Sequence, residues 1–261
     1  MSFFREFGEG LSSYGRAHRA IVEYKLGRYL VLPAIISIAY AVAYVALVIF
    51  LGYRVGDWAP DELPWYLSWM GGALAWLMRV GFWILMAWVF WLTYKFAIQS
   101  LLAPVLGALS ENLERKMRGR EPKELSMGDY VQDMIRAFKL SLRNLFLELL
   151  FTLLAGWIPI IGFILVFLIS AFYTGFGFMD FTLERKRYTI SESVRFARKH
   201  MGLCVGLGVV ANLALLIPIF GWMIMPSYST AAATLETMDE LEELKGGSSA
   251  GTPTGDPFAG V

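Results

Sequence analysis

The sequence is poor in the residue types on which most soluble enzymes depend. It has one cysteine and two histidines in 261 residues, and no Gly-rich phosphate loop, H-E-x-x-H or G-x-S-x-G motif. The single cysteine, Cys204, excludes an intramolecular disulfide and is interpreted as a small packing residue. The histidines, His18 and His200, lie in basic segments without metal-ligand spacing. We therefore expect no enzyme, no cofactor and no metal site.

Charge is also scarce. Charged residues make up 17% of the chain and hydrophobic residues 57%, whereas a soluble domain has about 25% charged residues. The net charge of +1 gives no reason to expect nucleic acid as a partner. Residues 29–53 contain no charged residue, and a helix of that length matches the hydrocarbon core of about 30 Å. The composition therefore predicts an all-α integral membrane protein in the lipid bilayer.

The apolar blocks predict a single membrane domain, residues 1–245, followed by a Gly/Ser/Pro-rich disordered tail, residues 246–261. Phe3, Phe4, Phe7, Leu11 and Tyr14 lie on one face of residues 3–14, which predicts an interfacial helix. The other expected elements are full spans at about 29–53 and 70–95, a cytoplasmic helical region at 96–144 broken near 119–122, and hairpins at about 145–178 and 201–235.

The distribution of lysine and arginine predicts the orientation. Residues 1–29 carry five of them, residues 95–144 nine, and residues 182–200 six. Because such residues favour the cytoplasmic side, we expect both termini in the cytoplasm and the acidic turn at 57–64 outside.

The last two apolar blocks each contain a Pro-x-x-Gly break, Pro159 with Gly162 and Pro218 with Gly221. In the first of these blocks the break leaves arms of about 14 and 16 residues, or ~21–24 Å, which is short of a ~30 Å core. This length predicts hairpins that enter only part of the bilayer. The half-helix ends at these apices suit an anion; alternatively, the two breaks are kinks in helix pairs that simply pack.

Four stretches then resemble one family: 26–33, 103–107 with Glu111 and Glu114, 178–187, and 217–226 with 231–234. In order and spacing they are similar to the CysZ sulfate permease family of the etoposide-induced-protein superfamily, over residues from about 10 to 236. The resemblance implies two full transmembrane helices, two partially inserted hairpins, a homo-oligomer, and sulfate entry across a bacterial inner membrane. The family pattern has two adjacent arginines before the first span; here Gly27 precedes Arg28.

Two groups of residues are candidates for function. Lys25, Gly27 and Arg28 are expected to bind an oxyanion, because a guanidinium offers forked donors and glycine admits the backbone; the alternative is an anchor for lipid phosphate. A second group is expected to form a cytoplasmic vestibule for anions, or else a solvated helix end. Its members are Asp180, Glu184, Arg185 and Arg187.

Four further features concern residues inside the apolar blocks. Arg79 is interpreted as snorkelling to the outer interface. Glu148 is expected to pair with Arg143 or Arg185, a proton-coupling role being the alternative. Asn212 is interpreted as a hydrogen-bonding contact between helices, and three glycines are interpreted as sites of close helix contact. The glycines are Gly202, Gly206 and Gly208.

The leading hypothesis is an inner-membrane permease for sulfate or a similar inorganic anion. The alternative is a membrane scaffold without transport activity, with the acidic segment 236–245 as a contact element. A membrane-embedded enzyme is least favoured, because the apolar blocks contain few His, Asp or Glu residues.

Overall fold

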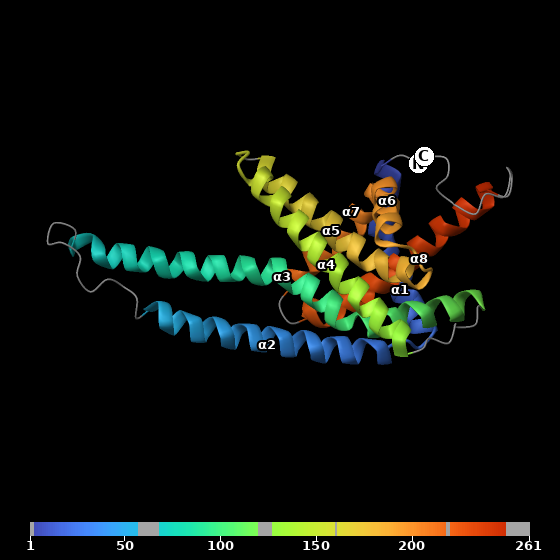
Figure 1. Cartoon of the computed structure of the whole chain (residues 1–261), viewed down its shortest axis with the longest axis horizontal. Helices are drawn as coiled ribbons and strands as arrows, with labels where there is room; N and C mark the ends of the chain where they lie inside the picture. The colour runs from blue at the N-terminus through green and yellow to red at the C-terminus, as the bar shows by residue number, and fades with distance from the viewer. Residues whose placement is uncertain (1–2, 57–67, 120–126, 160, 218–219, 249–261) are drawn as a thin grey trace.

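A computed structural model (Figure 1) describes residues 3–56, 68–119, 127–159, 161–217 and 220–248. Within these ranges all the regular elements are α-helices, which confirms the predicted all-α class. Their bounds are α1 Phe3–Glu23, α2 Arg28–Gly56, α3 Ser68–Arg118, α4 Met127–Gly156, α5 Ile161–Arg185, α6 Ile190–Lys199, α7 Met201–Leu215 and α8 Phe220–Ser248.

Helices α2 and α3 run as a long pair away from the body of the molecule (Figure 1). Aromatic side chains join them: the Tyr44 hydroxyl donates to the Met86 carbonyl at 2.7 Å, and its ring lies 4.9 Å from that of Phe90. Many other side chains of α2 and of the first half of α3 are apolar and exposed, so this part of the pair presents a lipid-compatible surface.

Three helices are long and apolar enough to cross a membrane, namely those over Arg28–Gly52, Trp76–Arg118 and Ile161–Arg185. The first two correspond to the predicted full spans. The third differs from the sequence expectation, because α5 continues past residue 178 to Arg185. Half of the residues in the most apolar 18-residue stretch of α5 are buried inside the protein, so much of this helix packs against other helices.

The two Pro-x-x-Gly breaks fold alike. Gly162 donates its amide to the Ile158 carbonyl at 2.9 Å, and Gly221 donates to Ile217 at 3.0 Å. In both turns a Cβ on the glycine would overlap a carbonyl oxygen seven residues earlier, which explains why glycine is required. Pro218 itself lies outside the described residues.

Helix α7 lies at the centre of the body and packs between α1 and α5. A Cβ on Gly206 would overlap the Phe7 carbonyl oxygen of α1, and a Cβ on Gly208 would overlap the Ala171 carbonyl oxygen of α5. The glycines therefore permit backbone-to-backbone approach on two faces of one helix. The predicted close helix contact is confirmed.

Helix α1 is amphipathic, and its small-residue face is buried against α7 and α8. The Tyr14 hydroxyl donates to the Leu207 carbonyl at 2.8 Å. Phe4, on the outer side, is 82% exposed. That α1 lies in the membrane interface stays a prediction.

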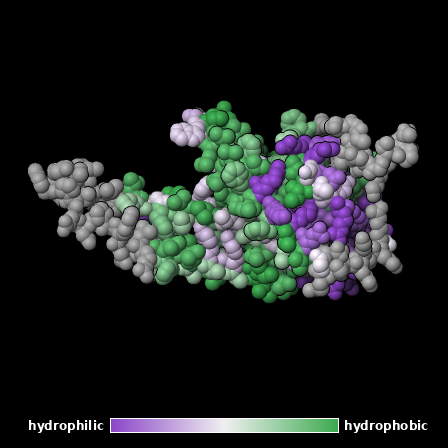
Figure 2. Space-filling view, in the orientation of Figure 1, coloured by the Kyte–Doolittle hydropathy of each residue, from purple (hydrophilic) through white to green (hydrophobic). Residues whose placement is uncertain are grey.

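The polar segments are helical extensions of the apolar ones. Helix α3 continues to Arg118 and ends before Gly119, whose φ is +64°, and α8 continues through the acidic segment to Ser248. Figure 2 shows the consequence: hydrophobic residues cover the α2–α3 side and hydrophilic residues gather at the opposite end. The acidic turn at 57–64 and the tail from residue 249 lie outside the described residues.

Candidate functional site: an anion-binding turn and buried charge clusters

The turn between α1 and α2 contains the predicted anion-binding residues. Helix α1 closes with Leu26 donating its amide to the Ile21 carbonyl at 2.9 Å, while Lys25 takes a φ of +52°. A lysine in this left-handed conformation is unusual, and such strain often marks a functional position. Lys25 and Arg187 are the two non-glycine residues with positive φ among those described, and both belong to the predicted sites.

Helix α2 starts in this turn, and its first backbone amides lack hydrogen-bond acceptors among the described residues. Among the hydrogen bonds of the described residues, the backbone amides of Gly27 and Arg28 have no acceptor, as is usual for a helix N-terminus. A Cβ on Gly27 would meet nothing within 4 Å, so the backbone is open to an approaching group. The Arg28 guanidinium is exposed and lies over the Tyr29 ring, 4.9 Å from its centroid. Amides and guanidinium together suit an anion.

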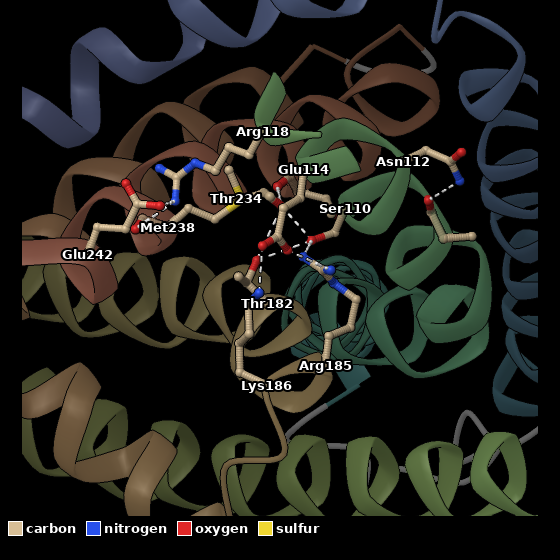
Figure 3. Close-up of polar contacts among 12 residues, drawn as sticks. Ser110, Asn112, Glu114, Arg118, Thr182, Arg185, Lys186, Thr234, Met238 and Glu242 are labelled. Atoms are coloured by element: carbon tan, nitrogen blue, oxygen red, sulfur yellow. Dashed lines mark hydrogen bonds and ion pairs between the residues drawn. The ribbon is translucent and has the colours of Figure 1, made fainter. Parts of the chain in front are cut away.

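A second site, drawn in Figure 3, lies where α3, α5 and α8 meet. Glu114 accepts from Arg185 at 3.0 Å and from Lys186 at 2.5 Å, while Arg185 also donates to the Ser110 hydroxyl at 2.8 Å. Ser110, Thr182 and Thr234 are fully buried and joined by hydrogen bonds of 2.8–3.2 Å. A cavity of about 230 Å³ borders Glu114, Lys186 and Arg118.

The two acids of the predicted vestibule, Asp180 and Glu184, pair with a residue that the sequence did not single out. Arg136 of α4 donates to Asp180 through both terminal guanidinium nitrogens, Nη1 at 2.7 Å and Nη2 at 3.0 Å, and Nη2 also donates to the Ser193 hydroxyl at 2.8 Å. Its distance to Glu184 is 3.7 Å. Asp180 and Glu184 are only 4% and 7% exposed, so these pairs hold α4 against α5. Arg187 is exposed at the end of α5.

A third cluster joins α3, α4 and α5 through Lys95 and Glu148, whose side chains are each 2% exposed. The Lys95 ammonium pairs with Glu148 and also donates to the Ser170 hydroxyl at 2.8 Å. The expectation that Glu148 pairs with Arg143 or Arg185 is therefore wrong. Because α3 continues as a largely buried helix beyond residue 95, Lys95 faces the protein interior.

Asn212 extends this cluster into α7. Its side-chain amide donates to Ser170 at 3.1 Å and accepts from Thr174 at 3.0 Å. The interpretation of Asn212 as a contact between helices is confirmed. Between this cluster and that of Glu114, the buried face of α3 carries Leu102 and Leu106, both 0% exposed, so an apolar layer separates two polar levels.

Sequence reasoning missed Lys95 and Arg136 because each was counted only as part of a basic segment. A usable signal was present for the first: Lys95 and Gln99 stand four residues apart, as do Ser170 and Thr174. Polar residues at that spacing in apolar runs mark one face of a helix. For Arg136 no local signal distinguishes it from the solvated cations around it.

A buried trio lies at the hydrophilic end, outside the candidate spans. His200 Nδ1 is 3.3 Å from a carboxylate oxygen of Glu6 and 3.3 Å from one of Glu240. Burial lowers the pKa of His200 to about 4 and raises the pKa of Glu240 to about 7. Burial also raises the pKa of Glu6. The trio connects α1, α8 and the junction between α6 and α7.

The apex residues lie at the tips of the two hairpins. Around Pro159 and Gly162 the side chains are strongly exposed and apolar, with Trp157 at 86% and Phe163 at 81%. Around Gly221 the preceding Leu216 and Ile217 are 62% and 54% exposed. The described surroundings of both apices are apolar, and their role in anion binding stays a prediction.

Apolar helices around buried, charge-compensated clusters define an α-helical integral membrane protein. The family described as "Sulfate transporter CysZ/Etoposide-induced protein 2.4" matches residues 13–226, and the chain belongs to it. It is 25% identical over 227 residues to the sulfate transporter CysZ of Pectobacterium atrosepticum, covering 83% of this chain and 80% of that one. It is 24% identical over 235 residues to that of Pseudomonas aeruginosa, covering 87% and 91%.

Proposed function

We propose that this chain is a permease for sulfate or a similar tetrahedral oxyanion. The observation that carries the proposal is the start of α2, where the amides of Gly27 and Arg28 lack acceptors among the described residues and the Arg28 guanidinium is exposed beside them. Helix N-termini and guanidinium groups bind tetrahedral oxyanions through several charge-assisted hydrogen bonds. The curated relatives, which are named sulfate transporters, make sulfate the first candidate.

The setting is a bacterial inner membrane with both termini in the cytoplasm. The basic stretches before α2, after the apolar part of α3 and around α6 favour the cytoplasmic side for those ends. The turn at 25–28 then lies where an anion enters or leaves on that side. Assembly into a homo-oligomer follows the family resemblance.

We propose further that the α4–α5 hairpin enters only part of the bilayer. On α5 the exposed large apolar residues lie between Ile161 and Leu168, close to the tip, and from Ser170 onward most residues of α5 are buried in protein. The stretch from Ile161 to Ser170 rises about 14 Å, which is half of a hydrocarbon core of about 30 Å. A fluorophore attached to the tip, quenched by lipids that carry a quencher at known bilayer depths, tests this. A tip located at the far interface would contradict the proposal.

Interior charge clusters suit a passive or gradient-coupled route. Lys95, Arg136 and Arg185 are each held by a carboxylate, so no interior cation of these three is left uncompensated. An anion then meets polar groups without being trapped by a bare charge, a condition for release as well as entry. The apolar layer of Leu102 and Leu106 would separate the two polar levels along such a route.

Uptake of sulfate into vesicles reconstituted with the purified protein tests the function. Arg28→Ala should weaken the apparent sulfate affinity by roughly 10- to 150-fold, since charged hydrogen bonds contribute about 1.5–3 kcal/mol. Arg28→Lys should retain part of it. Arg19→Ala removes an exposed arginine of α1 outside the turn and should leave uptake unchanged. Equal sulfate uptake by Arg28→Ala and Arg19→Ala would refute the proposal.

The scaffold alternative loses its main support. Its contact element was the acidic segment of α8, but this segment binds within the chain. Glu236 pairs with Arg16, and Asp239 pairs with Arg16 at 3.0 Å and Arg118 at 2.8 Å. These acids therefore fasten α8 to α1 and α3.

A further inference from the structure

An open apolar groove runs between α3 and α4, away from the turn at 25–28. Its volume is about 720 Å³. It is lined by Thr93, Phe96, Ala97, Ser100, Leu101, Met134, Ile135, Phe138, Lys139, Ser141, Leu142 and Leu145. With one exception, the charged Lys139, these side chains are apolar or carry a small hydroxyl. The groove therefore fits an aliphatic chain.

The α4 rim of the groove belongs to a longer exposed stripe. Val131, Met134, Phe138 and Leu142 are 49–58% exposed and recur every three or four residues along one face of α4. In water such a face would have to be covered. In a membrane protein, lipid acyl chains cover such a face.

One end of the groove is basic. Ile135 and Lys139 line both the groove and a second cavity of about 330 Å³, which also borders Arg136, Glu184 and Arg187. Lys139 is exposed and has no ion pair among the described residues, whereas Arg136 is held by Asp180. Lys139 is therefore the main cation that a ligand would meet, and Arg187 also borders the cavity. An apolar groove that opens onto a basic cavity has the polarity of a phospholipid with an anionic head group.

We propose that the groove and the basic cavity form one binding site for an anionic phospholipid, with an acyl chain along α3 and α4 and the phosphate at Lys139, on the side of Arg187. Basic pockets between membrane helices on the cytoplasmic side bind such head groups. This side is the one that the lysine and arginine distribution assigns to the cytoplasm. Charge complementarity favours lipid over a second copy of the chain, which would have to bring an acidic group to Lys139.

The test is a lipid titration of the full-length protein in detergent, followed by native mass spectrometry. Phosphatidylglycerol should bind more tightly than phosphatidylcholine with the same acyl chains. Lys139→Gln should weaken phosphatidylglycerol binding about fivefold, the contribution of one cation near an anionic head group, and leave phosphatidylcholine unchanged. Lys199→Gln, an exposed lysine of α6 outside both cavities, is the matched control and should change neither.

Ala97→Trp fills the groove from α3 and should weaken both lipids, since it displaces the acyl chain. Equal binding of the two lipids by the wild type, or equal effects of Lys139→Gln and Lys199→Gln, would overturn the proposal. Displacement of phosphatidylglycerol by inorganic phosphate would reduce the site to a simple anion cavity. A change of oligomeric state on Leu142→Gln, without any lipid preference, would assign the groove to a second copy. None of these outcomes depends on sulfate uptake.

Discussion

Replacing Lys95 with methionine should destabilise the protein strongly, because a buried carboxylate then loses its cation. The side chains of Lys95 and Glu148 are each 2% exposed, and the ammonium also donates to Ser170. Removing one partner of such a buried pair costs about 3–5 kcal/mol. At about 2–4 °C per kcal/mol for a chain of this size, the unfolding midpoint should fall by about 6–20 °C.

The double variant Lys95→Met with Glu148→Leu separates charge from packing. It removes both charges at similar volume, so its stability should match the wild type or exceed it by about 1–4 kcal/mol. Arg5→Met is the control, because it breaks an exposed pair with Glu9 that contributes little. Thermal unfolding in detergent, followed by tryptophan fluorescence, compares the three. A Lys95→Met midpoint equal to that of Arg5→Met, or a double variant no more stable than the single one, would refute this reasoning.

Two further predictions concern packing and pH. Gly208→Ala should lower the unfolding midpoint, because its Cβ would overlap a carbonyl of α5. Gly15→Ala, with nothing near its Cβ, should instead gain about 0.5–1 kcal/mol of helix propensity. Unfolding midpoints that shift in the same direction in the two variants would contradict the packing. The pKa of Glu240 is raised to about 7 beside His200 and Glu6, so the stability that its bound proton contributes is complete below the ordinary pKa and is lost as the pH rises through 7. The unfolding midpoint of Glu240→Gln, measured relative to that of the wild type, should therefore rise between pH 6 and pH 8. A midpoint difference that stays constant over this range would contradict the raised pKa of Glu240.

Much of the fold could be predicted because apolar blocks in a membrane protein have a required length. The span that begins near Tyr29 could be predicted from the length of its charge-free run. The end of α3 could be predicted from Gly119, because glycine at positive φ ends a helix. The turn at Gly162 could be placed because its Pro-x-x-Gly pattern recurs in the chain. What failed was the end of α5, since an apolar block ends where polar residues begin while the helix itself continues.

The candidate site divides in the same way. Lys25, Gly27 and Arg28 are near neighbours in the chain, so the local pattern alone was enough to group them. The interior pairs could not be found like this, because Lys95 and Glu148 are separated by 53 residues, and Arg136 and Asp180 by 44. Which cation of a basic segment turns inward depends on the rotation of its helix, and that is set by packing against other helices.

Helix α5 shows what this packing achieves. Ser170 and Arg185 bind polar groups of α3, Asp180 binds α4, and Gly175 admits the backbone of α7. A helix engaged on so many sides has little surface left for lipid, although it is apolar enough to span. Its hydropathy therefore reflects a buried position inside the protein as much as a place in the bilayer. For this chain, the partners of α5 define the interior through which an anion would have to pass, and the long α2–α3 pair anchors that interior in the membrane.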